Sequence, residues 1–216
     1  MTILALEFCS SQRSVALARG GRVLAEASET GGRETHAFGM IEKILTAANI
    51  GRAEIECIAV GMGPGSYTGI RVALSIAQGW QLATSVKLLG IGSVNCLAAQ
   101  AQAAKMLGRV TVVIDAQRGE FYQATYEITA EMILEIEPLR IVNFNEPACE
   151  DARPTIFVGP EIQKWFPSGK VLFPEASMLA TLAMQRTDFA AGEKLEPIYL
   201  REANFVKAPP ARTMVS

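Results

Sequence analysis

Hydrophobic positions along the chain follow two different periods, and these periods divide it into strands and helices. Short apolar runs predict buried strands at 3–8, 57–60, 88–91 and 110–114. Alternating segments separated by two glycines predict a hairpin at 14–18 and 22–28. Apolar residues three or four positions apart predict helices over 35–49, 67–86 and 94–107. The first half is therefore expected to run strand, strand, strand, helix, strand, helix, strand, helix.

A second and shorter pass of the same order begins at residue 109. Its first strand ends in Asp115, as the first strand of the chain ends in Glu7, and further strands are predicted at 121–128 and 132–142. After a polar loop at 145–154, short elements are predicted at 155–158, 161–166, 170–173 and 177–186. This order predicts an α/β fold of two ribonuclease-H-like lobes, as in the actin-like ATPases, with the second lobe trimmed. The lobes are expected at 1–108 and 109–216.

Composition and charge limit the classes of function. Half of the 216 residues are hydrophobic and 19% are charged, which predicts a sizeable core and excludes a disordered chain. The net charge of −2 argues against unaided RNA binding. The four cysteines lie far apart, without the spacing of a metal site. No membrane span and no signal peptide are predicted, so we expect a reduced, cytoplasmic protein.

The stretch from Gly61 to Arg71 joins a predicted strand to a predicted helix and is rich in glycine. Backbone N–H groups at such a helix start bind anions, and glycine lets a phosphate approach closely. The candidate residues of this anion loop are Gly63, Gly65, Ser66, Thr68 and Gly69. The alternative is a tight turn in which Ser66 or Thr68 caps the helix. Neither a dinucleotide fingerprint nor a P-loop is present, because the last glycine of the first and the lysine of the second are missing.

Glu7, Ser10 and Asp115 complete the candidate nucleotide site. In a two-lobed ATPase, acids at the ends of corresponding strands hold the metal of a nucleotide from both sides of a cleft. The alternative is that these acids cap or pair locally, which we favour for Glu7 because Phe8 and Cys9 follow it in place of small residues. The single histidine, His36, has no partner at ligand or triad spacing, so we predict neither a metal site nor a catalytic residue.

The predicted helix from Tyr67 to Val86 is apolar on all sides, with Arg71 as its only charge. Ile70 and Leu74 lie on one face, whereas Ile76 lies on the opposite face with Trp80 beside it. A helix of this kind is buried either in its own protein or against another one. A surface helix in a chain of this size should have a polar face, so we expect a partner protein.

Several motifs along the chain share one pattern. They are Gly-Pro-Gly-Ser-Tyr-Thr-Gly-Ile-Arg at 63–71, Ile-Asp-Ala at 114–116, Arg-Gly-Glu-Phe-Tyr at 118–122 and Pro-Ile-Tyr-Leu-Arg at 197–201. With the opening hairpin and His36, they resemble the TsaB family, the dimerisation subunit of the bacterial machinery that forms threonylcarbamoyladenosine in tRNA. The chain departs from the family at 7–10, where Glu-Phe-Cys-Ser replaces the usual Asp-Thr-Ser. This departure weakens a nucleotide role for the first lobe and leaves the dimerisation role untouched.

The resemblance implies an actin-like ATPase fold with a degraded active site and a non-catalytic role. It implies pairing with a TsaD-type catalytic subunit, joined by a TsaE-type ATPase, with tRNA reached only through the complex. A homodimer is the alternative for the chain alone, and no cofactor is expected unless a nucleotide binds at the heterodimer junction. In the family, the helices that correspond to 35–48 and 67–86 form a bundle with the partner. The expected interface residues are His36, Met40, Ile44, Tyr67, Ile70, Arg71, Leu74, Ile76 and Trp80.

A second hypothesis comes from the fold itself. Glu7, Asp115 and the glycine loop together would suit an independent ATP-dependent small-molecule kinase with the same two lobes. Binding of magnesium and ATP by the isolated chain separates this hypothesis from that of a non-catalytic subunit.

Overall fold

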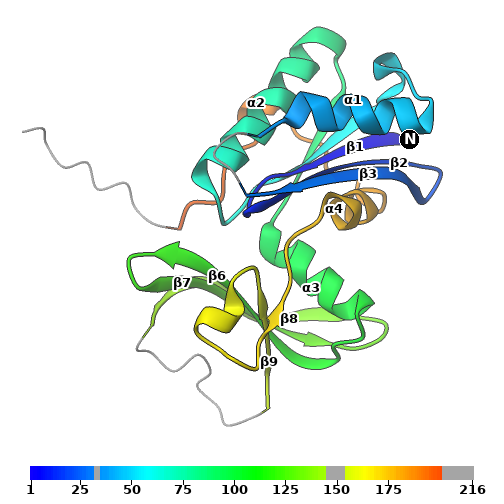
Figure 1. The fold of residues 1–216 in the computed structure, drawn as a ribbon. Helices are drawn as coiled ribbons and strands as arrows, with labels where there is room; N and C mark the ends of the chain where they lie inside the picture. Colours follow the sequence, from blue (N-terminus) through cyan, green and yellow to red (C-terminus); the bar gives the residue numbers. More distant parts are fainter. Residues whose placement is uncertain (32–34, 145–153, 201–216) are drawn as a thin grey trace, which may run out of the picture.

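The described residues form two five-stranded sheets, one below the other in the view of Figure 1. The computed structural model describes residues 1–31, 35–144 and 154–200, so most of the polar loop predicted at 145–154 and the chain beyond 200 lie outside it. The strand orders are β3-β2-β1-β4-β5 and β10-β9-β6-β7-β8. The first sheet contains β1 (Thr2–Glu7), β2 (Gln12–Arg19), β3 (Arg22–Thr30), β4 (Cys57–Gly61) and β5 (Lys87–Ile91).

Helices cover both faces of the first sheet. The helices α1 (Ala37–Ala48) and α2 (Tyr67–Thr84) lie on one face, and α4 (Ala176–Ala183) lies on the other (Figure 1). Along β1, Leu4 and Leu6 pack towards α1 and α2, whereas Ile3 and Ala5 pack towards α4. A strand that is buried on both faces needs an unbroken apolar run, which explains why this segment shows no alternation.

The strand register brings two separate parts of the chain to one edge of the first sheet. β1 is parallel to β4, with Leu6 opposite Val60. The segment after Glu7 and the loop after Gly61 therefore leave the sheet side by side, at the carboxyl ends of the parallel strands. Ligand sites of open α/β sheets lie at such edges.

The second sheet is joined to the first through α3 (Ser93–Ala103). Its strands are β6 (Gly108–Gln117), β7 (Glu120–Ile128), β8 (Ile133–Asn143), β9 (Ile156–Gly159) and β10 (Lys170–Val171). Val94, Leu97 and Ala101 of α3 pack on one face of this sheet. α3 ends four residues before the predicted end at 107, because Lys105 takes a left-handed conformation with a φ of 58°.

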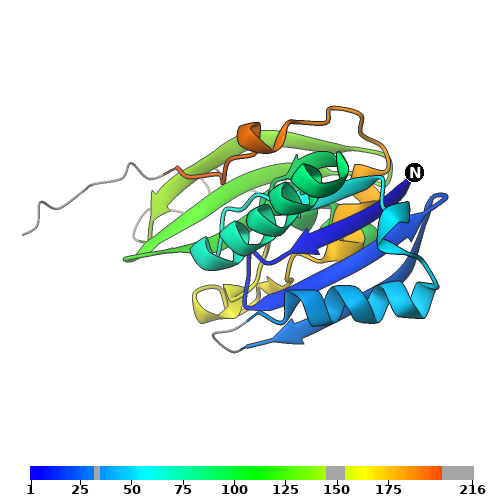
Figure 2. The ribbon, with the colours of Figure 1, turned by 90° about the horizontal axis from the view of Figure 1, so that it is seen from above.

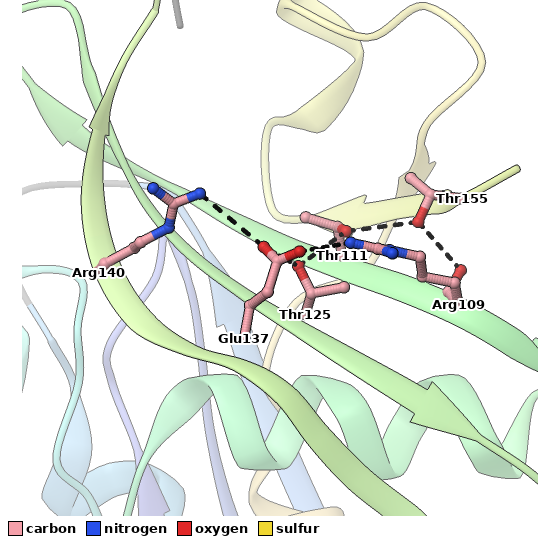
Figure 3. Close-up of polar contacts among 6 residues, drawn as sticks. All are labelled: Arg109, Thr111, Thr125, Glu137, Arg140 and Thr155. Carbon is pink, nitrogen blue, oxygen red and sulfur yellow. Dashed lines mark hydrogen bonds and ion pairs between the residues drawn. The ribbon is translucent and has the colours of Figure 1, made fainter. Parts of the chain in front are cut away.

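The opposite face of the second sheet carries a buried polar network (Figure 3). Arg109 of β6 donates a hydrogen bond to the carboxylate of Glu137 on β8, and Thr125 of β7 donates to the same group at 3.1 Å. The hydroxyls of Thr111 and Thr125 lie 3.2 Å apart, and the guanidinium of Arg140 lies 3.9 Å from the carboxylate of Glu137. The network links the side chains of three neighbouring strands, and the ion pair compensates the buried charges.

The predicted lobe boundary after residue 108 falls where β6 begins, yet the later chain returns to the first sheet. α4 packs on β1 and β2, and the backbone N–H of Ala176 donates to the hydroxyl of Ser14 at 2.9 Å. Small residues on both sides, among them Ala16 and Ala180, let the helix approach the sheet closely. The division at 108 remains a prediction. No helix in the described ranges is long and apolar enough to cross a membrane.

Candidate functional site

The glycine loop between β4 and α2 packs directly on the turn that follows β1. A Cβ atom at Gly65 would lie 2.0 Å from the carbonyl oxygen of Cys9, and one at Gly69 would lie 1.9 Å from that of Phe8. The N–H of Ser66 donates to the Cys9 carbonyl at 2.7 Å. These glycines therefore permit backbone to contact backbone inside the protein, a role that the sequence alone did not reveal.

Ser66 caps α2, in agreement with the alternative interpretation of the loop as a tight turn. Its hydroxyl accepts a hydrogen bond from the N–H of Gly69 at 3.2 Å. Since the N–H of Ser66 is also bonded, two of the loop amides point at the protein itself. They are not available to an anion, which argues against a phosphate cradle built from the loop backbone.

A cleft of about 740 Å³ lies beside the loop, between the two halves of the chain. Four of the predicted anion-site residues line it: Ser10, Gly65 and Ser66 from the first half and Asp115 from the second. The carboxylate of Asp115 accepts hydrogen bonds from Gln117, at 2.7 Å from its N–H and 3.0 Å from its Nε2. Asp115 thus stabilises its own turn, as one of the two interpretations of this residue had it.

Glu7 does not line this cleft; it is fully buried beneath it. Its Oε1 accepts the N–H of Cys9 at 2.7 Å, while Oε2 has no hydrogen-bond partner. Burial raises the pKa of Glu7 to about 7, which the bonds from Cys9 only partly offset. Gly61 packs against the carboxylate, because a Cβ there would lie 2.2 Å from Oε2. The strand end thus turns this side chain into the core and away from the cleft, where it pairs locally, as in the interpretation favoured for Glu7.

The remaining loop residues lie elsewhere. The carbonyl oxygen of Gly63 accepts a hydrogen bond from the N–H of Ser93 at 2.8 Å. Gly69 is enclosed by the Phe8 backbone, and Thr68 faces the opposite side of α2. The structure therefore brings only part of the predicted anion site together.

A second concave surface, the α1/α2 groove, lies between the two helices that share one face of the first sheet. Figure 2 shows these helices side by side across the sheet. The groove has a volume of about 670 Å³ and is lined mostly by apolar atoms, with Tyr67, Arg71, Ile76 and Trp80 among the predicted interface residues. An adjoining hollow of about 420 Å³ shares Phe38 and Trp80 with it.

Phe38 lines both the groove and the adjoining hollow, although the sequence pattern did not predict it there. Its side chain is 66% exposed, which is unusual for a phenylalanine on a helix that is otherwise well packed. One sequence signal could have pointed to it: Phe38 is a large apolar residue of the expected helix, but it does not belong to the row of α1 residues that the sheet buries. Exposed apolar side chains gathered in one hollow mark interaction surfaces.

Four predicted interface residues belong to the protein's own core instead. Met40 and Ile44 of α1, and Ile70 and Leu74 of α2, are buried in the cluster between these helices and the first sheet. Their side chains are therefore covered by the sheet and stabilise the fold. His36 is exposed just before α1, where its ring nitrogen lies 3.2 Å from the carboxylate of Glu29.

An aromatic and cationic cluster lies at the end of the groove. The rings of Tyr67 and Tyr199 stack with centroids 5.8 Å apart, and the guanidinium of Arg71 lies 3.9 Å from the centre of the Tyr67 ring. The Nε of Arg71 donates to the Tyr199 hydroxyl at 3.1 Å. Tyr199 belongs to the motif at 197–201, and nothing in the sequence pattern pairs it with Arg71, 128 positions away.

The chemistry of the described residues is limited. Cys9, Cys57 and Cys96 are buried free thiols, and burial raises the pKa of Cys57 to about 11. Within the described ranges, no three histidine, cysteine, aspartate or glutamate side chains are grouped so that they could hold a metal ion. The features of the α1/α2 groove that suit it for binding are therefore its shape and its mostly apolar lining.

Comparison with known proteins places the chain among described families. The family described as "TsaD: tRNA N6-adenosine threonylcarbamoyltransferase" matches residues 8–200. The "tRNA threonylcarbamoyladenosine biosynthesis protein TsaB" of Escherichia coli (strain K12) is 31% identical over 93% of this chain and 95% of its own length. The protein of the same name from Haemophilus influenzae is 28% identical over 97% of this chain and 98% of its own length.

Solved structures agree with this assignment. The structure titled "YeaZ from Pseudomonas aeruginosa" has a TM-score of 0.81 and 26% identity, covering 92% of this chain and 99% of that one. The predicted fold of two ribonuclease-H-like lobes and the resemblance found in the sequence are both confirmed. The chain thus has a TsaD-like domain and belongs to the TsaB family, whose relatives are named tRNA threonylcarbamoyladenosine biosynthesis proteins.

Proposed function

We propose that the protein is a non-catalytic subunit in the formation of threonylcarbamoyladenosine in tRNA, and that it binds a TsaD-type catalytic subunit through the α1/α2 groove. Its relatives are named for this biosynthesis. The observation that carries the proposal is the apolar groove, in which Phe38, Tyr67 and Trp80 gather at the surface of the helix pair. Exposed aromatic side chains in a hollow are typical of the anchor residues of protein interfaces.

The non-catalytic role draws support from the placement of the candidate acids. Glu7 is buried outside the cleft, and the carboxylate of Asp115 is bonded to Gln117 of its own turn. Glu7 therefore cannot reach a ligand in the cleft, and Asp115, although it lines the cleft, has both oxygens bonded within its own turn. We propose that the chain works in the cytoplasm, that a TsaE-type ATPase joins the pair, and that tRNA is reached through the complex.

Charge substitutions on α1 and α2 test the docking surface. We expect Phe38→Glu to abolish co-elution with the TsaD-type protein of the same genome in size-exclusion chromatography with light scattering, since it places a charge in an apolar interface. Phe38 suits this test better than Ile76, because Ile76 also packs on the core. Leu82→Glu is the matched control: Leu82 is 90% exposed on α2 and lines neither hollow.

The outcomes separate the proposal from its rivals. A folded Phe38→Glu variant that pairs as strongly as wild type would show that the groove is not the interface. A wild-type chain that forms no complex at all would overturn the proposed partnership. If mixing yields only copies of this chain bound to one another, the homodimer is the preferred state.

The kinase hypothesis has one observation in its favour, the cleft that Ser10 and Asp115 line from opposite halves of the chain. Titration calorimetry of the isolated chain with magnesium and ATP decides between the two. Tight binding with phosphoryl transfer to an acceptor would favour the kinase. Absence of heat, together with clean heterodimer formation, would favour the subunit and leave any nucleotide to the junction with the partner.

A further inference from the structure

Among the described residues, the α1/α2 groove contains one cation, Arg71, in surroundings that are otherwise uncharged and mostly apolar. α2 carries no other charged residue over its 18 residues. Val72, Ile76 and Trp80 line the groove beyond it. If the groove is an interface, as the proposed function holds, then docking takes this guanidinium out of water. A charge removed from water is costly unless the partner supplies an opposite charge.

Arg71 is held in a fixed orientation before any partner arrives. Its guanidinium lies over the Tyr67 ring at 3.9 Å, and its Nε donates to the Tyr199 hydroxyl at 3.1 Å. Tyr199 is itself anchored, because the neighbouring residue Ile198 donates its N–H to the carbonyl of Met62 at 2.8 Å. Arg71 remains exposed, so a ligand can reach it, and these contacts reduce the conformational entropy that the side chain loses on binding.

Within the described ranges, neither the chain itself nor the α1/α2 face of a second copy offers a free acid to Arg71. Among the described residues, no acidic side chain lies within ion-pair distance of Arg71. α2 has no acidic residue, and the only acid of α1, Glu42, is already bonded to Arg52 through two guanidinium nitrogens. Two copies that pack through these helices would therefore bury Arg71 without a free carboxylate from either helix.

RNA is a poor occupant of this surface. Binding to a phosphate backbone requires several cations along one face, whereas the described lining of the groove has one and the whole chain has a net charge of −2. The aromatic and aliphatic lining suits a protein surface instead. The ligand of Arg71 is therefore expected to be a carboxylate on a protein.

We propose that the partner subunit presents an acidic side chain to Arg71, and that this ion pair makes the groove select that partner over a second copy of this chain. The planar guanidinium accepts a carboxylate in a bidentate geometry, which adds specificity to the apolar contact. Arg71 is thus a specificity-determining residue of the docking surface. This inference rests on the proposed partnership and names the chemistry of its contact.

Binding measurements on Arg71 variants test the inference. We expect Arg71→Leu to weaken binding to the TsaD-type protein by at least about 30-fold, because the partner's carboxylate is left buried and unpaired. Self-association of the variant, measured by analytical ultracentrifugation, should be unchanged or stronger than that of wild type. Arg71→Lys should have an intermediate affinity, since lysine keeps the charge but cannot donate two parallel hydrogen bonds to a carboxylate. Arg22→Leu is the control, on the exposed edge strand β3.

Further variants keep the test decisive if Arg71→Leu fails to fold. Tyr199→Phe removes only the hydroxyl that orients Arg71, and should weaken binding by about 3- to 10-fold. Arg71→Glu should lose binding, and an acid-to-arginine change in the partner should restore it. If only one acid-to-arginine variant of the partner restores binding to Arg71→Glu, its position identifies the carboxylate that contacts Arg71.

Each result has a separate meaning. If wild type forms no heterodimer, the proposed function fails. If wild type pairs but Arg71→Leu and Tyr199→Phe pair equally well, the proposed function stands and this inference is overturned. If Arg71→Leu loses tRNA retention by the assembled complex with no change in protein affinity, the ligand is an RNA phosphate and the inference is equally overturned.

Discussion

A single carboxylate shows how much one residue of this core depends on its surroundings. Glu7 sits at the end of β1 with no exposed surface, one oxygen bonded to the Cys9 N–H and the other without a partner. Burial raises its pKa from 4.5 to about 7. Because the folded-state pKa lies above the unfolded value, the group favours folding only when protonated.

The stability of the protein should therefore fall as the pH rises from about 5 to about 8. The full cost at high pH is about 3 kcal/mol, from the difference between the two pKa values. Glu7→Gln removes the charge and should flatten this pH dependence, so that the variant is the more stable protein at pH 8. Urea unfolding at pH 5 and pH 8 measures the effect. Glu196→Gln, on an exposed segment, is the control, and equal slopes in wild type and Glu7→Gln would contradict the assignment.

At the scale of an element, the position of α2 depends on glycine in its first turn. A Cβ at Gly69 would meet the Phe8 carbonyl oxygen at 1.9 Å, whereas one at Gly79, in the same helix, would meet no atom within 4 Å. We expect Gly69→Ala to destabilise the protein by about 2–4 kcal/mol, because backbone must move to relieve the overlap. Gly79→Ala should instead stabilise it by about 0.5–1 kcal/mol through helix propensity.

Thermal unfolding of both variants measures this difference. Both variants replace glycine by alanine in the same helix, so the gain in helix propensity is similar in both. The difference in stability then reports the contacts of the added Cβ atom. If Gly69→Ala were as stable as Gly79→Ala, the close approach of α2 to the turn after β1 would be wrong.

The elements themselves were largely predictable from the sequence, and the contacts between them were not. Unbroken apolar runs gave the central strands, and helical spacing gave α1 and α2. Helical spacing puts Ile70 and Leu74 on one face of α2 and Ile76 on the other. Because the helix is apolar all round, the sequence could not show which of these faces the sheet covers. The glycine loop likewise suggested a phosphate site. The groups that contact its glycines are the carbonyls of Phe8 and Cys9, and the sequence could not show this contact because these residues lie about 60 positions away along the chain.

At the scale of the whole molecule, α4 ties the two halves of the chain together. It follows the second sheet in sequence but packs on β1 and β2 of the first through Leu179, Ala180 and Ala183. α3 contacts both α4 and the second sheet. We therefore expect the two sheets to unfold in one cooperative step rather than as independent units.

The two tryptophans report on this cooperativity, since Trp80 lies on α2 above the first sheet and Trp165 packs on Phe121 of the second at 4.9 Å. In Trp80→Phe and Trp165→Phe variants, the remaining tryptophan should give the same urea midpoint. Ala180→Leu should lower both midpoints together, by about 1–3 kcal/mol in stability, because the buried site at 180 has no room for the larger side chain. Ala47→Leu, on the exposed side of α1, should leave both midpoints in place. If Ala180→Leu lowered only the midpoint that Trp80 reports, the second sheet would fold without the first, and α4 would stabilise the first sheet alone.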